Sequence, residues 1–283
     1  MRDTIDINSN DNALFITSQC NNRCVMCCQP PLLRNDLDGY FQKNMALIDS
    51  APRELRSLGI TGGEPTLLGD RLFELLRHVR TKLPETEIHL LTNGRAFADK
   101  EYARKLAECG EEKILLGVPL HADSAGDHDT ITQVKGSFEE TMLGLYNLGR
   151  YDIGIELRAV ITKMNYRRLP KLPDFIYRNL PFVEFISLMG LEYTGYTIKN
   201  REAVWIDPMD YQAELTQAVL ELRDWRMDVS IFNRGAFSQK RYGPLPANPY
   251  PTGKPNTSIF AGNVLSNRNV ADYSQHPECK VGE

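Results

Sequence analysis

Apolar and polar residues follow two alternating periodicities along the first 232 residues of the chain. Short apolar runs typical of buried strands occupy residues 13–18, 55–60, 87–94, 113–120, 153–161, 183–189 and 228–232. Between them, apolar residues spaced three and four apart predict helices near 40–49, from Asp70, from Asp99, from Ser137, over 168–179, and from Asp207 to about 224. This regular alternation of strands and helices predicts an α/β fold with a parallel sheet.

Three of the predicted helices begin at residues that commonly cap helices. Asp70 precedes a helix with one apolar face, and Ser137 with Glu140 matches a capping box. The pair Asp207-Pro208 places proline at a first helical position, where its missing N–H costs nothing.

Six or seven strand–helix units favour an open, partial (β/α)6 barrel of the TIM type over a closed eightfold barrel. We expect the barrel over residues 12–200, with 208–232 closing its edge, so that residues 1–232 form one domain. Residues 233–283 are rich in proline, glycine and asparagine and predict an irregular C-terminal extension. The prolines of 243–255 cannot extend a sheet because proline has no N–H to donate.

Composition and charge narrow the class of protein. The formal charge of −4 provides no general basic field for nucleic acid, and no apolar stretch reaches the roughly 20 residues that span a bilayer. The N-terminal apolar run is too short for a secretory signal. We therefore expect a cytoplasmic protein that binds neither nucleic acid nor membrane.

Four of the six cysteines lie within nine residues, at the end of the first predicted strand. A cluster this dense suits metal or redox chemistry better than a disulfide framework. Structural zinc usually requires four ligands, and the chain has no second CxxC pair. A thioredoxin-like site should open a helix, but Pro30 and Pro31 follow directly. A [4Fe–4S] cluster held by three thiolates would instead leave one iron open to bind a ligand.

The spacing of Cys20, Cys24 and Cys27 is CxxxCxxC, and the second predicted strand is followed by Gly62-Gly63-Glu64-Pro65. Together, in this order, the two motifs resemble the radical SAM superfamily. The resemblance implies that the three cysteines bind a [4Fe–4S] cluster whose open iron holds S-adenosylmethionine. It also implies that the GGEP loop takes the methionine amino group, for which a carboxylate is a matched acceptor. The implied chemistry is reductive cleavage of S-adenosylmethionine to a 5′-deoxyadenosyl radical, which abstracts a hydrogen from the substrate.

Further cofactor contacts follow from the same resemblance, and each has a simpler alternative. Met26 lies where the family often has an aromatic residue near adenine, or it is loop core. Thr92 and Asn93 end the third strand and could face the cofactor, or form a turn with Gly94. Arg158 could bind the methionine carboxylate, or pair with Glu156 on the same strand face.

The sequence favours structural roles for the other polar residues. We expect His128 and Asp129 to cap or hold the loop after the fourth strand, and His121 to be structural. Cys28 is left out of the ligand set because adjacent side chains diverge, and Cys109 is expected in the core. Cys279 alone cannot hold an additional cluster.

Residues 12–232 most resemble the HxsC-type maturase of the His-Xaa-Ser peptide system. This resemblance implies a precursor peptide as substrate, a second radical SAM maturase as partner, and an electron donor such as flavodoxin or ferredoxin. Two alternatives stay open. One is a radical SAM enzyme that acts on a small molecule or nucleotide, and the other is a non-catalytic metal-binding protein.

Overall fold

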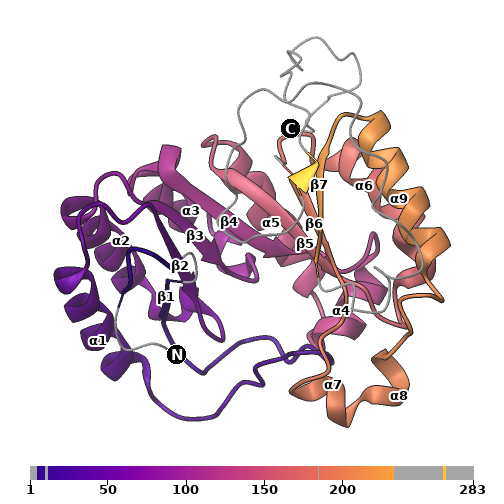
Figure 1. Cartoon of the computed structure of the whole chain (residues 1–283), viewed down its shortest axis with the longest axis horizontal. Coiled ribbons are helices and arrows are strands. Elements are labelled where there is room, and N and C mark those ends of the chain that lie inside the picture. Colours follow the sequence, from indigo (N-terminus) through magenta and orange to yellow (C-terminus); the bar gives the residue numbers. More distant parts are fainter. Residues whose placement is uncertain (1–4, 10–11, 184, 233–263, 266–283) are drawn as a thin grey trace.

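The computed structural model describes residues 5–9, 12–183, 185–232 and 264–265. Its centre is one twisted sheet whose strands lie side by side in chain order (Figure 1). The first seven strands are parallel: β1 (Ala13–Phe15), β2 (Ser57–Thr61), β3 (Glu87–Leu91), β4 (Ile114–Pro119), β5 (Gly154–Val160), β6 (Phe185–Met189) and β7 (Asp228–Phe232). β1 and β7 lie six positions apart in the sheet and are not paired with each other, so the barrel is open, as predicted.

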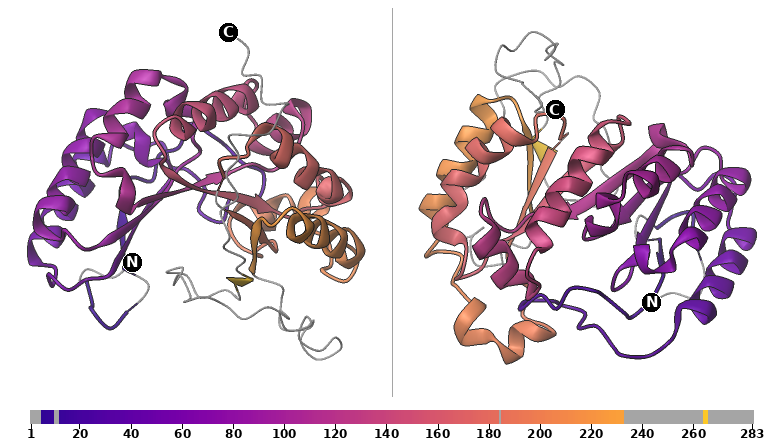
Figure 2. Two further views of the ribbon diagram at one scale, coloured as in Figure 1. Left: turned by 90° about the horizontal axis from the view of Figure 1, so that it is seen from above. Right: turned by 180° about the vertical axis from the view of Figure 1, so that it is seen from behind.

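Helices connect the strands and cover the convex face of the sheet, as Figure 2 shows from above. The longer ones are α1 (Leu37–Ser50), α2 (Asp70–Lys82), α3 (Lys100–Ala107), α4 (Ala125–Thr132), α5 (Ser137–Gly149), α6 (Leu172–Asn179) and α9 (Gln212–Asp224). Short helices are η1 (Pro65–Leu68), η2 (Arg95–Ala98), η3 (Glu111–Lys113), η4 (Tyr166–Lys171), α7 (Tyr196–Lys199) and α8 (Arg201–Val204).

The two faces of the sheet differ in polarity because successive side chains along a strand alternate. On β5, Ile155, Leu157 and Ala159 are fully buried and belong to the apolar core that packs against the helices. Glu156 and Arg158 project from the other face, toward the interior of the open barrel. The core therefore lies outside the strands, and the barrel interior is polar.

Helices α2, α5 and α9 begin differently from the sequence expectation. α2 is capped by Gly69 and α9 by Tyr211, so Asp70 and Asp207 are not their caps. Gly136 is the N-cap residue of α5. The N–H groups of Gly136 and Phe138 at this helix start donate to the carboxylate of Asp129, seven and nine residues earlier in the sequence. Asp99, in contrast, caps α3 as expected, accepting from the N–H of Glu101.

One part of the C-terminal extension joins the sheet. Strand β8 (Val264–Leu265) pairs antiparallel with β7, so a short segment of the predicted irregular extension adopts strand structure. An edge strand exposes unpaired N–H and C=O groups, which explains why a short segment can add there. The proline-rich stretch 243–255 lies outside the described residues. Among the described helices, none is long and apolar enough to cross a membrane.

Candidate functional site

The cysteine loop begins after β1 and crosses toward α4 and α7, on the far side of the barrel mouth (Figure 1). Its two ends are tied together by Asp36, which accepts from the hydroxyl of Thr17 at 2.5 Å and from the N–H of Ser18 at 3.0 Å. Burial opposes ionisation of Asp36, but the hydrogen bonds from Ser18 and Thr17 outweigh it and lower the pKa of this carboxyl.

The three motif cysteines are partly buried, whereas Cys28 is exposed. Burial, with smaller contributions from the neighbouring thiols, raises the pKa of Cys20 to about 11 and that of Cys24 to about 12. Burial is also the main reason why the pKa of Cys27 is raised. Three thiols that disfavour each other's ionisation lie close together, and such a group releases its protons readily only to a bound cation.

The GGEP loop after β2 is hydrogen-bonded to the residues directly before Cys20. The N–H of Gly63 donates to the carbonyl of Thr17 at 2.7 Å, and the N–H of Glu64 donates to that of Gln19 at 2.8 Å. A Cβ on Gly63 would lie 1.9 Å from the Gln19 carbonyl oxygen, so this approach requires glycine. The two sequence motifs therefore form one site.

Glu64 is 1% exposed, and its carboxylate accepts four hydrogen bonds from the chain. The donors are the N–H and hydroxyl of Thr66, the hydroxyl of Thr92 and the N–H of Asn93, at 2.7–3.0 Å. A carboxylate has about four acceptor positions, so these donors take up most of its capacity. Glu64 thus joins the GGEP loop to the end of β3, where the sequence placed Thr92 and Asn93.

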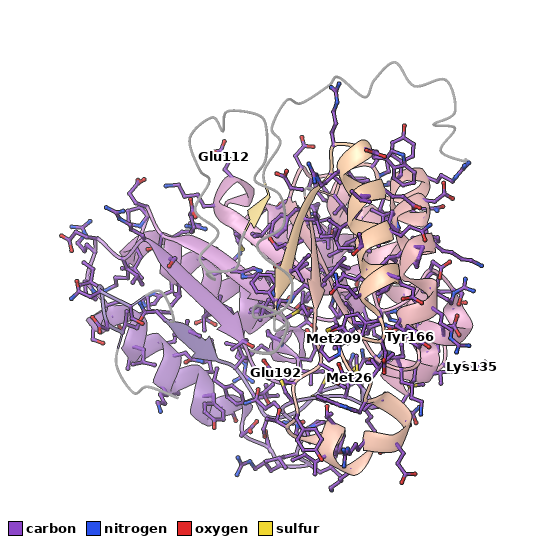
Figure 3. The ribbon with its side chains drawn as sticks, turned by 45° about the vertical axis from the view of Figure 1, so that its right-hand side comes forward. Met26, Glu112, Lys135, Tyr166, Glu192 and Met209 are labelled. Atoms are coloured by element: carbon purple, nitrogen blue, oxygen red, sulfur yellow. The ribbon has the colours of Figure 1, made fainter. Side chains whose placement is uncertain are left out.

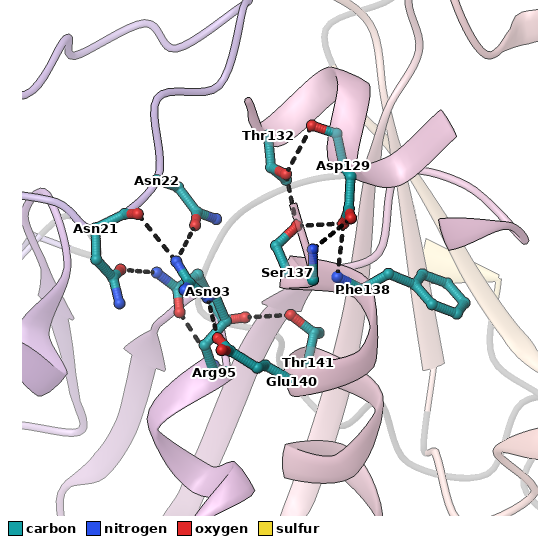
Figure 4. A network of polar contacts seen from close by, with 12 residues as sticks. Asn21, Asn22, Asn93, Arg95, Asp129, Thr132, Ser137, Phe138, Glu140 and Thr141 are labelled. Carbon is teal, nitrogen blue, oxygen red and sulfur yellow. Dashed lines mark hydrogen bonds and ion pairs between the residues drawn. The ribbon is translucent and has the colours of Figure 1, made fainter. Parts of the chain in front are cut away.

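A polar network extends from the end of β3 to the cysteine loop, as Figure 4 shows. Asn93 donates to the side chain of Asn21 at 2.5 Å. Arg95 donates to the carbonyl of Asn21 at 2.9 Å and to the Asn22 side chain at 2.7 Å, and its Nε lies 2.6 Å from Glu140. Sequence analysis missed Arg95, because its partners in the cysteine loop, Asn21 and Asn22, lie more than 70 residues away and no local pattern indicates them.

Arg158 pairs with Glu156 inside the barrel, at 3.2 Å, which is the simpler of the two sequence alternatives. The Glu156 carboxylate also lies 2.7 Å from His89 Nε2 and accepts from the hydroxyl of Ser187. Burial opposes ionisation of Glu156, but His89, Arg158 and Ser187 lower the pKa of its carboxyl. A Cβ on Gly117 would lie 3.0 Å from Arg158 Cδ, so the arginine side chain packs over β4, and its guanidinium donates to the sulfur of Met189 on β6 at 3.3 Å.

The remaining sequence candidates lie in the core or support loops. Met26 is 6% exposed. His121 and His128 are buried and stacked, with ring centroids 5.7 Å apart, which confirms structural positions for both. Asp129 holds the start of α5, as expected, and Cys109 is core.

The donor set fits an iron–sulfur cube better than a single ion. Among the described residues, no three His, Cys, Asp or Glu side chains converge as ligands of one metal ion. In a cube each thiolate binds a different iron, so its ligands need not converge on one point. Three neighbouring thiols at the end of β1, beside a glycine loop, meet that requirement.

A sequence model of the radical SAM superfamily matches residues 14–176, more than half of the chain. This chain belongs to the radical SAM superfamily. Members of the superfamily use a [4Fe–4S] cluster and S-adenosylmethionine. The matched segment includes the cysteine loop, the GGEP loop and strands β2 to β5 in full.

Two curated radical SAM relatives illustrate the range of similar proteins. Fe-coproporphyrin III synthase of Methanosarcina barkeri is 33% identical over 181 residues, which cover 62% of this chain and 43% of that protein. A probable GTP 3′,8-cyclase of Thermococcus kodakarensis is 26% identical over 219 residues, covering 76% of this chain and 68% of that protein. The chain thus spans less than half of the first relative.

Solved radical SAM structures share the fold. Streptococcus suis SuiB bound to S-adenosylmethionine superposes with a TM-score of 0.62 at 18% identity, over 82% of this chain and 52% of SuiB. The protein anSMEcpe with bound AdoMet and a Kp18Cys peptide gives 0.55 at 18% identity, over 76% of this chain and 59% of that one. Both likenesses support the open parallel barrel.

Proposed function

We propose that this chain binds a [4Fe–4S] cluster through Cys20, Cys24 and Cys27 and S-adenosylmethionine at the GGEP loop. The observation that carries the proposal is the pair of backbone hydrogen bonds that joins Gly63 and Glu64 to the residues before Cys20. Because of these bonds, a ligand on an open iron would meet the glycine loop directly.

Each residue of the site has a role that its contacts support. The three thiolates hold the cluster, and Gly62 and Gly63 let backbone carbonyls approach the methionine ammonium closely. Glu64 supports this loop from below, because most of its acceptor capacity is used within the chain, and it adds negative charge near the ammonium. When bound, the cluster and S-adenosylmethionine supply one-electron cleavage of the sulfonium, which yields a radical that takes hydrogen from a substrate.

Five further residues complete the proposed cofactor site. Pro65 fixes the backbone at the start of η1, directly after the glycines. Thr92 and Asn93 hold the opposite wall through Glu64. Arg158 faces the barrel interior and, anchored by Glu156, presents guanidinium N–H groups suited to the methionine carboxylate. The buried thioether of Met26 provides an apolar contact beside the cysteines for adenine.

For the substrate, we propose a ribosomally made precursor peptide of the His-Xaa-Ser type. The sequences of the segments 15–31, 59–70, 90–99 and 179–196 support this subfamily, together with an open barrel that leaves lateral access for a chain-like substrate. The partners proposed with it are a second radical SAM maturase and an electron donor such as flavodoxin or ferredoxin.

A second candidate is a small-molecule substrate, such as a tetrapyrrole or a nucleotide. The names of the two curated relatives above favour it, and the polar interior formed by His89, Glu156, Arg158 and Ser187 suits such ligands.

One experiment separates these proposals. Reduced protein, purified anaerobically, is incubated with S-adenosylmethionine in three parallel reactions. These contain a His-Xaa-Ser precursor peptide, iron coproporphyrin III or GTP. Mass spectrometry follows 5′-deoxyadenosine and the mass of each substrate. A changed peptide mass supports the peptide proposal, and a change only in a small molecule replaces it. Zinc in place of four irons per chain, with no cleavage, would refute the enzyme proposal.

A further inference from the structure

The segment after β6 packs against the cysteine loop. The N–H of Tyr196 donates to the carbonyl of Cys27 at 2.8 Å, and the Thr197 hydroxyl donates to that of Met26 at 3.3 Å. The Asn200 side chain donates to the carbonyl of Val25 at 2.8 Å. One segment therefore binds three consecutive carbonyl groups of the cysteine loop. Thr197 lies 171 residues after Met26, and Asn200 lies 175 residues after Val25. Figure 3 shows Met26 beside the segment that carries Glu192.

Gly195, at the start of this segment, touches the cysteine loop through its backbone. Its φ of +55° is a conformation that favours glycine. A Cβ at this position would lie 2.3 Å from the carbonyl oxygen of Cys27 and 2.6 Å from that of Cys28. Both distances are to backbone atoms, so the loop itself would have to move.

The opposite side of the cysteine loop is bound by the end of α4. The N–H of Arg23 donates to the carbonyl of Thr132 at 3.0 Å, and the N–H of Val25 donates to that of Ile131 at 2.9 Å. The loop therefore donates from the N–H groups of Arg23 and Val25 on one side, and accepts at the carbonyl groups of residues 25–27 on the other. Two elements far apart in sequence fix the backbone that presents Cys24 and Cys27.

We propose that residues 195–200 are a clasp that positions the cysteine loop for the cluster. The clasp acts on the backbone and not on the iron, so its members are positioning residues. By holding the loop in one conformation before the cluster binds, it reduces the entropy that binding must remove. The inference rests on the proposed function, and it extends the site beyond residue 176, where the superfamily match ends.

The first test compares two glycines with nearly the same backbone conformation. Gly195 has φ +55° and ψ −128°, and Gly69 has φ +61° and ψ −136°, but a Cβ on Gly69 would meet nothing within 4 Å. Gly195→Ala and Gly69→Ala therefore carry similar backbone strain, and only the first displaces the cysteine loop. After anaerobic reconstitution, we expect Gly195→Ala to lose iron to a chelator about tenfold or more faster than Gly69→Ala.

The second test removes one hydrogen bond and avoids a steric clash. Asn200→Ala deletes the bond to Val25, and Asn179→Ala deletes a matched bond of 2.8 Å from a half-buried asparagine to the carbonyl of Phe175 on α6. We expect iron release about two- to tenfold faster in Asn200→Ala, which is the effect of one hydrogen bond, and unchanged release in Asn179→Ala. In the cluster-free protein, amide hydrogen exchange of residues 23–27 should accelerate only in Asn200→Ala.

The outcomes distinguish the clasp from the function on which it rests. If the unsubstituted protein binds four irons and both clasp variants release iron and exchange amides as their controls do, the clasp is refuted and the proposed function stands. If the unsubstituted protein binds no cluster, the proposed function fails and the clasp fails with it. Should Gly195→Ala not fold, Asn200→Ala alone decides the matter.

Discussion

The carboxylate of Glu64 accepts hydrogen bonds from two loops, so exchanging one of its oxygens for an amide group tests how the site is held together. In Glu64→Gln, an NH2 group replaces one carboxylate oxygen and faces groups that also donate. The backbone N–H of Asn93 can only donate, so it cannot accept a hydrogen bond from this NH2. We expect the cluster-free protein to lose about 1.5–3 kcal/mol of unfolding free energy, since a charged buried hydrogen bond is lost. Affinity for S-adenosylmethionine should fall about ten- to hundredfold in an anaerobic titration.

The stability of the cluster-free variant separates two roles of Glu64. Unchanged stability with weaker S-adenosylmethionine binding would mean that the carboxylate mainly contacts the ligand. Unchanged affinity would remove Glu64 from the site. Glu101→Gln on α3, an exposed residue that accepts from Arg104, is the control and should change neither measurement.

A second prediction concerns which thiols bind iron. Cys24→Ala should abolish the four-iron cluster, because two thiolates remain where three are needed. Cys28→Ala should keep most of the iron, because Cys28 is exposed and lies outside the spacing of the motif. Iron analysis and the visible absorption of the reconstituted proteins measure both. Full iron content in Cys24→Ala would refute the ligand assignment.

Single residues show where sequence analysis reaches its limit. Cys20, Cys24, Cys27 and the GGEP loop were found because their spacing is itself the chemical signal, and the hydrogen bonds between the two motifs agree with one site. Arg95 was missed because its contacts to Asn21 and Asn22 depend on tertiary structure.

At the scale of elements, periodicity predicted strands and long helices well, and helix starts less well. The predicted ends of strands β2 to β7 lie within about two or three residues of the observed ends. The start of α5 was assigned to a capping box, but Asp129 of α4 supplies the acceptors from seven to nine residues away. Helices α4, α7 and α8 were not predicted; α7 and α8 have four residues each, too few to show a period.

The packing of α4 against the end of β4 gives a prediction about acid stability. Burial lowers the pKa of His121 to about 3 and that of His128 to about 4. The unfolded chain, with histidine pKa values near 6.5, therefore binds more protons below that pH, and stability falls as the pH drops from about 6.5 to about 4. The slope is at most about 1.4 kcal/mol per pH unit for each histidine.

Replacing both histidines tests this cause. His128 Nδ1 accepts a hydrogen bond from the backbone N–H of His121. In the double variant His121→Asn and His128→Asn, the side-chain amide oxygen at position 128 can accept this bond from the backbone N–H at position 121. Denaturant unfolding between pH 4 and 7 should show a flatter dependence in this variant. An identical slope in the variant and the unsubstituted protein would contradict the assignment.

For the whole molecule, the alternating pattern predicted an open parallel barrel because each strand–helix unit buries an apolar face independently of the others. It could not predict the path of the cysteine loop across the mouth, because that path depends on contacts with α4 and α7. Nor could it predict β8, whose two residues carry no strand signal of their own.

The proposed division into a barrel of residues 1–232 and an extension of 233–283 has a direct test. Limited proteolysis should cut first between about 235 and 275, because that sequence is rich in proline, glycine and polar residues, and should leave a stable core. Mass spectrometry of the first fragments locates the cuts. First cuts within 60–190 would contradict a single barrel.

The bond between Val25 and Asn200 spans 175 residues, which matters for how the protein is made. At synthesis rates of about 5–20 residues per second, the ribosome needs on the order of ten to thirty seconds to make the intervening chain. Throughout that time the three thiols have emerged, but the segment that fixes their loop does not yet exist. The cell must therefore keep them reduced and free of competing metals until synthesis has passed residue 200, and iron–sulfur insertion belongs to the period after the barrel is complete.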